Sequence, residues 1–251
     1  MRRRTFLPRT RFLIGLMGIA LVMLMMAAGT ASAQTQPRQP YLDRPAEVRL
    51  PDSYQEGREY PLIVYLPFTG SSAAVFRDRL ERDTRLPEAI ALLPAGTPVR
   101  DHYLPDFWSF ILWYEERLLQ DLARVRSRYN VDEDAIVIAG FSLGGDLGWA
   151  LGIRNPDLFT GAVLAGTRTS YPPNDEALEA MRDSDYRAAL VIGRQELRAR
   201  YDGIRNARGI LDAADVSYRY REVDGGHTWG TAPDFVRDLR WALGLTNQRP
   251  F

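Results

Sequence analysis

The sequence predicts a single α/β domain in which a mainly parallel sheet is covered by helices on both faces. From Tyr60 onward, short apolar runs alternate with longer amphipathic runs, the pattern of strands joined by crossover helices. Most of the apolar runs lack polar alternation, as expected for strands that are buried on both faces. The chain has 251 residues, and about 210 remain beyond its N-terminal segment, a length that suits one domain.

The expected elements follow this alternation along the chain. Strands are predicted at 62–66, 89–94, 135–139, 161–165, 188–192 and 217–223, with an edge segment near Val48. The main helices are predicted at 110–129, 143–153, 201–213 and 232–243. Residues 167–186 contain Pro172, Pro173 and several acids, and they interrupt the alternation. We interpret them as an excursion over the sheet edge, with part of a lid as one interpretation.

The N-terminus has the pattern of an export signal. Basic residues precede an uncharged apolar run at 12–28, and Ala31-Ser32-Ala33 then supplies the small residues that signal peptidase recognises. We expect a signal peptide at 1–33, a lead-in linker at 34–45 and the folded domain at 46–251, with the mature protein exported to the periplasm or secreted. Arg3-Arg4-Thr5-Phe6-Leu7 resembles a twin-arginine signal, so a Sec or twin-arginine route and an uncleaved anchor remain open.

Composition excludes several functional classes. The chain carries 32 basic and 32 acidic residues, and the signal holds part of the positive charge, so the mature domain offers no basic footprint for nucleic acid. It has no cysteine, which excludes disulfides and thiolate metal sites. Neither a dinucleotide fingerprint nor a phosphate-binding glycine loop is present. We expect no cofactor, no metal, no nucleic-acid partner and no membrane partner after signal cleavage.

A serine between two glycines is the strongest chemical motif. Gly140-Phe141-Ser142-Leu143-Gly144 stands between a β-rich run and a helix of small residues. A strand-to-helix turn that exposes a serine brings its flanks close to neighbouring backbone, which favours glycine there. The helix that begins at Leu143 directs N–H groups and the positive end of its dipole toward the same place. This context predicts that Ser142 is a nucleophile.

A serine nucleophile needs a base, and the chain has only two histidines. His227 follows the last predicted strand, which places it at the carboxyl edge of the sheet with Ser142. His102 precedes the serine in the sequence. The order serine then histidine favours His227 as the base, and His102 is interpreted as a pocket-wall or surface residue.

Three motifs together resemble the α/β-hydrolase superfamily. They are Gly140-Phe141-Ser142-Leu143-Gly144-Gly145, Asn155-Pro156-Asp157-Leu158-Phe159 and Gly225-Gly226-His227-Thr228-Trp229. More narrowly, they are similar to exported esterases grouped with polyhydroxybutyrate depolymerases and feruloyl esterases. The resemblance extends over residues 60–243 and implies an α/β-hydrolase fold. Its motifs are specific for the fold and the reaction class, but they do not specify the substrate.

The resemblance implies a third catalytic residue, an acid after the strand at 188–192. Gly193-Arg194-Gln195-Glu196 stands where the family usually has G-x-x-D, so Glu196 is the matching acid. Asp202, six residues later, remains the alternative. Asp175, Asp183 and Asp185 are interpreted as solvated charges of the excursion.

The resemblance also implies an oxyanion hole made by the N–H groups of Leu143 and Thr69. Here the sequence departs from the family, because Pro67-Phe68 stands where His-Gly is expected. If Phe68 adopted the unusual backbone dihedral of the family's glycine, it would be strained. A displaced loop with an incomplete hole is therefore the alternative.

The function implied is a serine carboxylic-ester hydrolase that acts by an acyl-enzyme mechanism on an envelope or extracellular ester, either a small molecule or a polymer. Two other interpretations stay open. One is a non-catalytic binding protein on a hydrolase scaffold, suggested by the changed loop before Thr69 and by Glu196. The other is an acyltransferase or peptidase that uses the same three residues.

Overall fold

The computed structural model describes residues 37–245. The chain divides into two units, residues 1–35 and residues 36–251. The signal peptide predicted at 1–33 and the first residues of the predicted lead-in therefore lie outside the described residues. No helix within 37–245 is long and apolar enough to cross a membrane.

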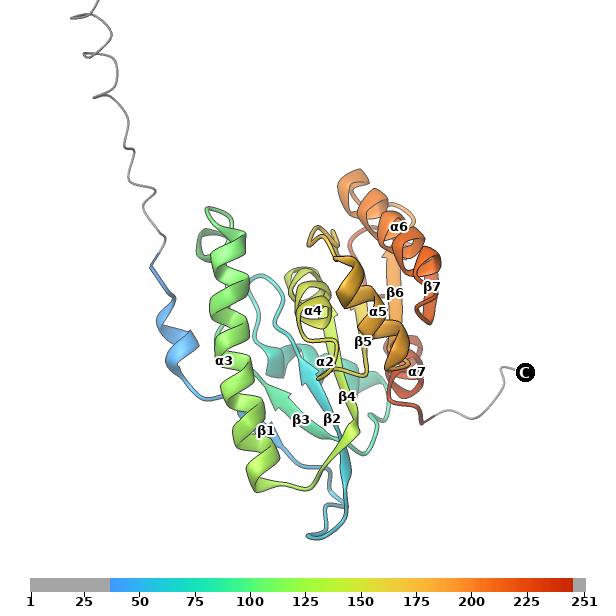
Figure 1. Cartoon of the computed structure of the whole chain (residues 1–251). Coiled ribbons are helices and arrows are strands. Elements are labelled where there is room, and N and C mark those ends of the chain that lie inside the picture. The colour runs from blue at the N-terminus through green and yellow to red at the C-terminus, as the bar shows by residue number, and fades with distance from the viewer. Residues whose placement is uncertain (1–36, 246–251) are drawn as a thin grey trace, which may run out of the picture. The chain divides into compact units, whose positions relative to one another are not determined.

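A seven-stranded sheet in the order β1-β3-β2-β4-β5-β6-β7 forms the centre of the domain (Figure 1). Only the edge strand β1 is antiparallel to its neighbour, and the other pairings are parallel. The strands are β1 (Glu47–Arg49), β2 (Tyr60–Tyr65), β3 (Ile90–Leu93), β4 (Val131–Phe141), β5 (Gly161–Ala165), β6 (Arg187–Gly193) and β7 (Tyr218–Val223).

Helices cover both faces of this sheet (Figure 1). They are α2 (Ala73–Asp83), α3 (Phe107–Arg128), α4 (Leu143–Arg154), α5 (Asp175–Asp183), α6 (Arg198–Ala213) and α7 (Ala232–Ala242), with short 3-10 helices η1 (Pro40–Asp43) and η2 (Arg100–His102). The side chains of α3, α4, α5 and α6 pack on one face, and those of α2 and α7 on the other. The prediction of a mainly parallel, doubly covered sheet is confirmed.

Alternate residues of each buried strand pack into the two hydrophobic cores, which lie on opposite faces of the sheet. Leu62 and Val64 of β2 pack under α3 and α4, whereas Ile63 and Tyr65 pack under α2 and α7. Successive side chains of a strand point to opposite faces, so a strand with helices on both sides needs apolar residues at every position. This is the physical reason why the runs showed no polar alternation.

Two helices differ from expectation. Residues 73–83, for which no element was predicted, form α2. The side chain of Ser72 caps the N-terminus of this helix by accepting a hydrogen bond from the Val75 N–H. The interpretation of 167–186 as an excursion over the sheet edge is wrong, because this segment contains α5, the crossover helix between the adjacent parallel strands β5 and β6. Asn174 caps α5, and the buried Ala177 and Met181 anchor it to the core. Pro172, Pro173 and the acids of this segment favoured an irregular interpretation, although Ala177 and Met181 stand at helical spacing on one face.

The segment assigned to the lead-in linker contains an ordered part. Residues 40–43 form η1, where Tyr41 and Leu42 are buried in the same core as α3. Arg38 also makes an ion pair of 2.6 Å with Glu116 of α3. The described part of this segment therefore packs on the domain.

The sheet topology decides where the site forms. The parallel strands β4, β5, β6 and β7 all end at the same edge of the sheet. Loops that are far apart in the sequence therefore converge at that edge, the usual position of a site in an open α/β sheet.

Candidate active site

Ser142 occupies the turn between β4 and α4. Its backbone has φ 58° and ψ −117°, a conformation that is rare for a residue with a side chain. Such strain costs about 1–3 kcal/mol and persists only where the surrounding structure enforces it. Ser142 is 7% exposed. Its N–H donates to the carbonyl of Ala165, so the strained turn is fastened to β5.

The glycines on either side of the serine are required by close contacts. A Cβ at Gly140 would lie 2.2 Å from the carbonyl oxygen of Gly144, and a Cβ at Gly144 would lie 2.8 Å from that of Leu66. Both distances are shorter than a carbon–oxygen contact allows, and backbone atoms cannot rotate away. The turn therefore closes only with glycine at both positions.

His227 lies in the loop after β7 and reaches the serine. Its Nε2 is 2.8 Å from Ser142 Oγ, and its ring packs on Phe141 with the ring centroids 4.7 Å apart. The imidazole is thus held between an aromatic ring of the turn and the serine hydroxyl.

Glu196 follows β6 and lies on the opposite side of the imidazole. Its Oε2 is 2.6 Å from His227 Nδ1, while its Oε1 accepts the N–H of Leu197 at 2.8 Å. The Glu196 side chain is 1% exposed. An ionised carboxylate can only accept, so Nδ1 carries the proton and Nε2 accepts from the serine hydroxyl. The close approach of the two loops needs glycine, because a Cβ at Gly193 would lie 1.9 Å from the carbonyl oxygen of Gly226.

The other acids proposed from the sequence lie elsewhere. Asp202 is exposed on α6, where it pairs with Arg198 at 3.2 Å. Asp175 and Asp183 are exposed at the two ends of α5, and Asp185 is exposed just after it. The structure thus connects Ser142, His227 and Glu196 by hydrogen bonds, and these four acids are not part of that network.

The loop after β2 carries Thr69 beside the serine cleft, with its hydroxyl 2.8 Å from the hydroxyl of Tyr103. The positive φ in this loop belongs to Gly70, at 76°, and not to Phe68. Phe68 is therefore free of the strain that the family's dihedral would impose on it. Its ring instead packs edge-on against Phe141 with the centroids 5.6 Å apart.

His102 takes no part in this arrangement. It ends η2, its Nδ1 accepts the N–H of Val99 at 3.3 Å, and its ring lies 5.5 Å from that of Tyr41. This half-buried position agrees with its interpretation as a wall or surface residue.

A cleft of about 760 Å³ opens above Ser142 and His227. Its apolar lining includes Phe68, Leu104, Phe141 and Leu197, and its polar lining includes Thr69, Tyr103, Gln195, Glu196, Arg100, Arg168 and Arg200. None of the three arginines was among the site residues predicted from the sequence. Their positions after β3, after β5 and at the start of α6 could have suggested them, since these segments follow strands that end at the same edge.

A buried carboxylate holds two of these arginines. Asp146, in the first turn of α4, accepts from Thr167 Oγ1 at 2.8 Å and from the N–H of Arg168 at 2.6 Å. The same carboxylate lies 3.2 Å from Arg168 Nη1 and 3.7 Å from Arg200 Nη1. It thereby ties the loop after β5 and the helix α6 to the turn that carries Ser142.

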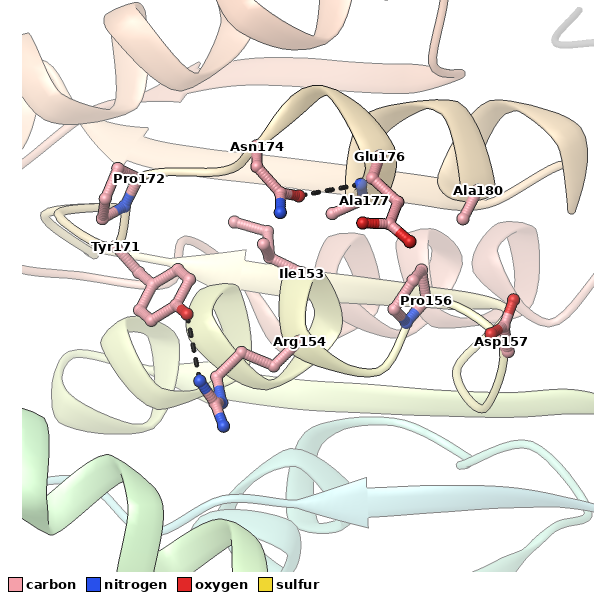
Figure 2. Close-up of a pocket in the computed structure, with 10 residues that line it drawn as sticks. All are labelled: Ile153, Arg154, Pro156, Asp157, Tyr171, Pro172, Asn174, Glu176, Ala177 and Ala180. Atoms are coloured by element: carbon pink, nitrogen blue, oxygen red, sulfur yellow. Dashed lines mark hydrogen bonds between the residues drawn. The ribbon is translucent and has the colours of Figure 1, made fainter.

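A second hollow of about 420 Å³ lies at the other end of α4, facing α5 (Figure 2). Figure 2 shows the hydrogen bond that Arg154 donates to the Tyr171 hydroxyl at 3.1 Å. The labelled lining residues hold no nucleophile paired with a base. Among residues 37–245, no group of three or more histidine, aspartate or glutamate side chains could hold a metal ion.

Comparison with known proteins supports the same fold. A ferulic acid esterase structure is 18% identical over 84% of this chain and 96% of its own, with a TM-score of 0.63. The Bacillus cereus carboxylesterase is 14% identical over 80% of this chain and 94% of its own, with a TM-score of 0.62. S-formylglutathione hydrolase (FrmB) from Staphylococcus aureus is 16% identical over 82% of this chain and 94% of its own, with a TM-score of 0.58.

These structural similarities agree with a family assignment. A comparison with curated proteins gave no match. The model of the family "Esterase", described as "Putative esterase", matches residues 41–244 and so covers every strand of the sheet together with the serine turn. The chain therefore belongs to this Esterase family and is a serine hydrolase with the α/β-hydrolase fold.

Proposed function

We propose that this protein hydrolyses carboxylic esters through an acyl-enzyme intermediate, with Ser142 as nucleophile, His227 as general base and acid, and Glu196 as the residue that orients the imidazole. One observation carries the proposal: a continuous hydrogen-bonded chain runs from Ser142 Oγ through His227 to Glu196, with distances of 2.8 Å and 2.6 Å. A nucleophile, a base and an orienting acid in this order activate a serine hydroxyl.

In the first half of the reaction, Ser142 Oγ attacks the ester carbonyl carbon while its proton passes to His227 Nε2. The tetrahedral intermediate then breaks its bond to the alcohol oxygen, which leaves with the proton from Nε2. The acyl group remains bonded to Ser142 Oγ.

In the second half, a water molecule attacks the acyl carbon and gives its proton to Nε2. The bond to Ser142 Oγ breaks, the serine recovers the proton, and the carboxylic acid is released. Glu196 stabilises the imidazolium formed in both halves and holds the proton of the neutral ring on Nδ1.

We assign oxyanion stabilisation to the N–H groups of Leu143 and Thr69. Leu143 is the first residue of α4, and the first N–H groups of a helix have no partner within it. The same helix end carries a partial positive charge, which favours a developing oxyanion. Thr69 is held near the cleft by the bond between its side chain and Tyr103.

Covalent labelling with a fluorophosphonate probe, together with hydrolysis of short p-nitrophenyl esters, tests this proposal. We expect labelling and turnover in the wild-type protein, and neither in Ser142→Ala. A folded wild-type protein that is not labelled would favour a non-catalytic binding protein. Transfer of the acyl group to an added alcohol in preference to water would favour an acyltransferase instead.

We further propose that the mature enzyme acts outside the cytoplasm, on an envelope or extracellular ester. The support is the basic and apolar pattern of residues 1–33 with the small residues Ala31-Ser32-Ala33. Mass spectrometry of the protein expressed in a bacterium with its full N-terminus provides the test. A mature chain beginning at Gln34 in the periplasm or medium is expected, and an intact N-terminus in the cytoplasm would contradict it.

A further inference from the structure

The cleft above Ser142 has an excess of positive charge. Arg100, Arg168 and Arg200 line it, and of the described lining residues Glu196 alone is acidic. Both oxygens of Glu196 are already occupied, one by His227 Nδ1 and the other by the N–H of Leu197. These hydrogen bonds leave the negative charge of Glu196 in place, and it supplies one unit of counter-charge to three guanidinium groups, so the rest must come from elsewhere.

Asp146 supplies only part of that counter-charge. Its Oδ2 lies 3.2 Å from Arg168 Nη1 and 3.7 Å from Arg200 Nη1, so one negative charge is shared by two positive ones. Burial lowers the pKa of the Arg200 guanidinium, the charge of Arg168 adds to this effect, and the carboxylates of Asp146 and Glu196 oppose it. An anionic ligand would add negative charge to a cleft lined by three arginines and one glutamate.

Of these two arginines, Arg168 is the more accessible from the cleft. Its side chain is 44% exposed, whereas that of Arg200 is 10% exposed and directs Nη1 to the carbonyl of Gly166. A guanidinium has five N–H donors in a planar fork that matches a carboxylate or phosphate. The bond to Asp146 occupies one side of the Arg168 fork and leaves other donors for a ligand.

The backbone around Arg168 is held in place. Its N–H donates to Asp146 Oδ1 at 2.6 Å, and a Cβ at Gly203 of α6 would lie 2.0 Å from its carbonyl oxygen. The helix α6 thus packs directly on this loop, and Asp146 ties the loop to the first turn of α4. Arg168 is consequently fixed relative to the serine turn, as a specificity residue requires.

Apolar side chains complete the cleft. Leu104 and Leu197 are 59% and 71% exposed at the cleft, and Phe68 and Phe141 also line it. Together they offer apolar contact for a carbon chain between a reacting ester and a charged group. A cleft with a reactive serine, an apolar surface and a fixed arginine matches a molecule with these same three parts.

We propose that this enzyme selects esters that carry a separate anionic group, a carboxylate or a phosphate, which Arg168 binds while Arg100 and Arg200 add positive potential. The inference rests on the proposed ester hydrolysis and specifies its substrate class. The anionic group stays bonded to its own part of the substrate and takes no part in bond breaking. It positions the ester carbonyl over Ser142 Oγ.

Matched substrates test the proposal. The mono-p-nitrophenyl ester of glutaric acid carries a terminal carboxylate, and the p-nitrophenyl ester of glutaramic acid replaces it with a neutral amide of nearly the same shape. A third ester carries a terminal phosphate on a chain of the same length. We expect kcat/KM for the carboxylate or the phosphate ester to exceed that for the amide by roughly 10- to 100-fold, the value of a charge-assisted hydrogen bond. The larger ratio identifies the preferred anion.

Arginine variants assign the effect to its residue. Arg168→Gln should reduce the preference for the anionic ester at least tenfold, to a ratio near one, and Arg168→Lys should retain part of it because it keeps the charge but loses the fork. Arg128→Gln is the matched control, since Arg128 is exposed at the far end of α3 and does not line the cleft. Circular dichroism checks that each variant is folded.

A second measurement separates binding from turnover. Glutarate monomethyl ester should bind to the inactive Ser142→Ala protein in calorimetry, and the added Arg168→Gln change should weaken this binding roughly tenfold or more. A wild-type enzyme that is labelled by fluorophosphonate but shows equal kcat/KM for the anionic and neutral esters would overturn the substrate class and leave ester hydrolysis intact. Absence of both labelling and turnover would overturn both proposals.

Discussion

The polar side chains at the two ends of helix α4 are arranged in opposite ways. At the N-terminal end, Ser142 holds a strained backbone conformation, and its hydroxyl meets His227 beside an open cleft. At the C-terminal end, Arg154 and Asn155 both donate to Glu115 of α3, so the polar side chains satisfy one another. Both ends border a hollow, yet only the N-terminal hollow contains a nucleophile with its base.

The N-terminal end of α4 is therefore reactive, whereas its C-terminal end is structural. Backbone strain and polar groups directed at a cleft lower the stability of a protein, and where the surrounding structure maintains them they are typical of functional sites. A closed network of charged hydrogen bonds instead joins two helices and rigidifies the core. Changes at the N-terminal end should therefore reduce turnover while stability is kept, and changes at the C-terminal end should do the reverse.

The largest effect is expected from Ser142→Ala. Loss of the nucleophile should lower kcat by about 10⁶-fold, the scale seen when a catalytic serine is removed. The free energy of unfolding should change little, because alanine keeps the Cβ and the backbone of the turn. Ser127→Ala, at an exposed position on α3, is the control. Retention of turnover by a folded Ser142→Ala protein would contradict the assignment of the nucleophile.

Glu196→Gln should have the next largest effect. An amide cannot stabilise the imidazolium as a carboxylate does, so kcat should fall by roughly 10⁴-fold with substrate binding retained. Asp202→Asn is the matched control, because Asp202 is exposed and its pair with Arg198 contributes little. If the Asp202 variant lost turnover and the Glu196 variant kept it, the orienting acid would have to be reassigned.

Glu115→Gln tests the structural end. Glu115 is 8% exposed and accepts from Arg154 at 2.7 Å and from Asn155 at 2.7 Å. Losing its charge should lower the free energy of unfolding by about 1.5–3 kcal/mol, the range for a hydrogen bond to a charged group. Urea titration measures this change. The rate of p-nitrophenyl ester hydrolysis at saturating substrate should stay at the wild-type value, and a large loss would show that the two ends of α4 are coupled.

Tyr171→Phe should give the smallest effect. It removes the 3.1 Å bond from Arg154 to the tyrosine hydroxyl and keeps the backbone carbonyl that accepts the Trp149 indole N–H. The hydroxyl bond is exposed, so about 0.5 kcal/mol or less of unfolding free energy is expected to be lost. A loss as large as that of Glu115→Gln would show that Tyr171 belongs to the closed network.

The alternation of strands and helices and the place of the serine turn could be predicted from the residues alone. These features depend on local sequence. Uninterrupted apolar runs are expected of strands that are covered on both faces. Glycine is expected beside Ser142 because the turn is tight, and a Cβ at Gly140 would lie 2.2 Å from a backbone oxygen. Local patterns failed for α5, whose few buried residues give a weak signal within a polar segment. The helix α2 was missed although its sequence carries a local pattern, with Ser72 as N-cap and Ala73, Phe76 and Leu80 at helical spacing.

Contacts between side chains that are distant in the sequence could not be predicted in this way and follow from the folded arrangement. Glu196 and Asp202 are six residues apart, and the loop that follows β6 turns the first toward His227 while the helix α6 carries the second into solvent. The sharing of Asp146 by Arg168 and Arg200 is equally invisible in the sequence, since it depends on the adjacency of β4, β5 and β6. Residue patterns record how each segment is buried, whereas contacts between loops depend on the order in which the strands pair.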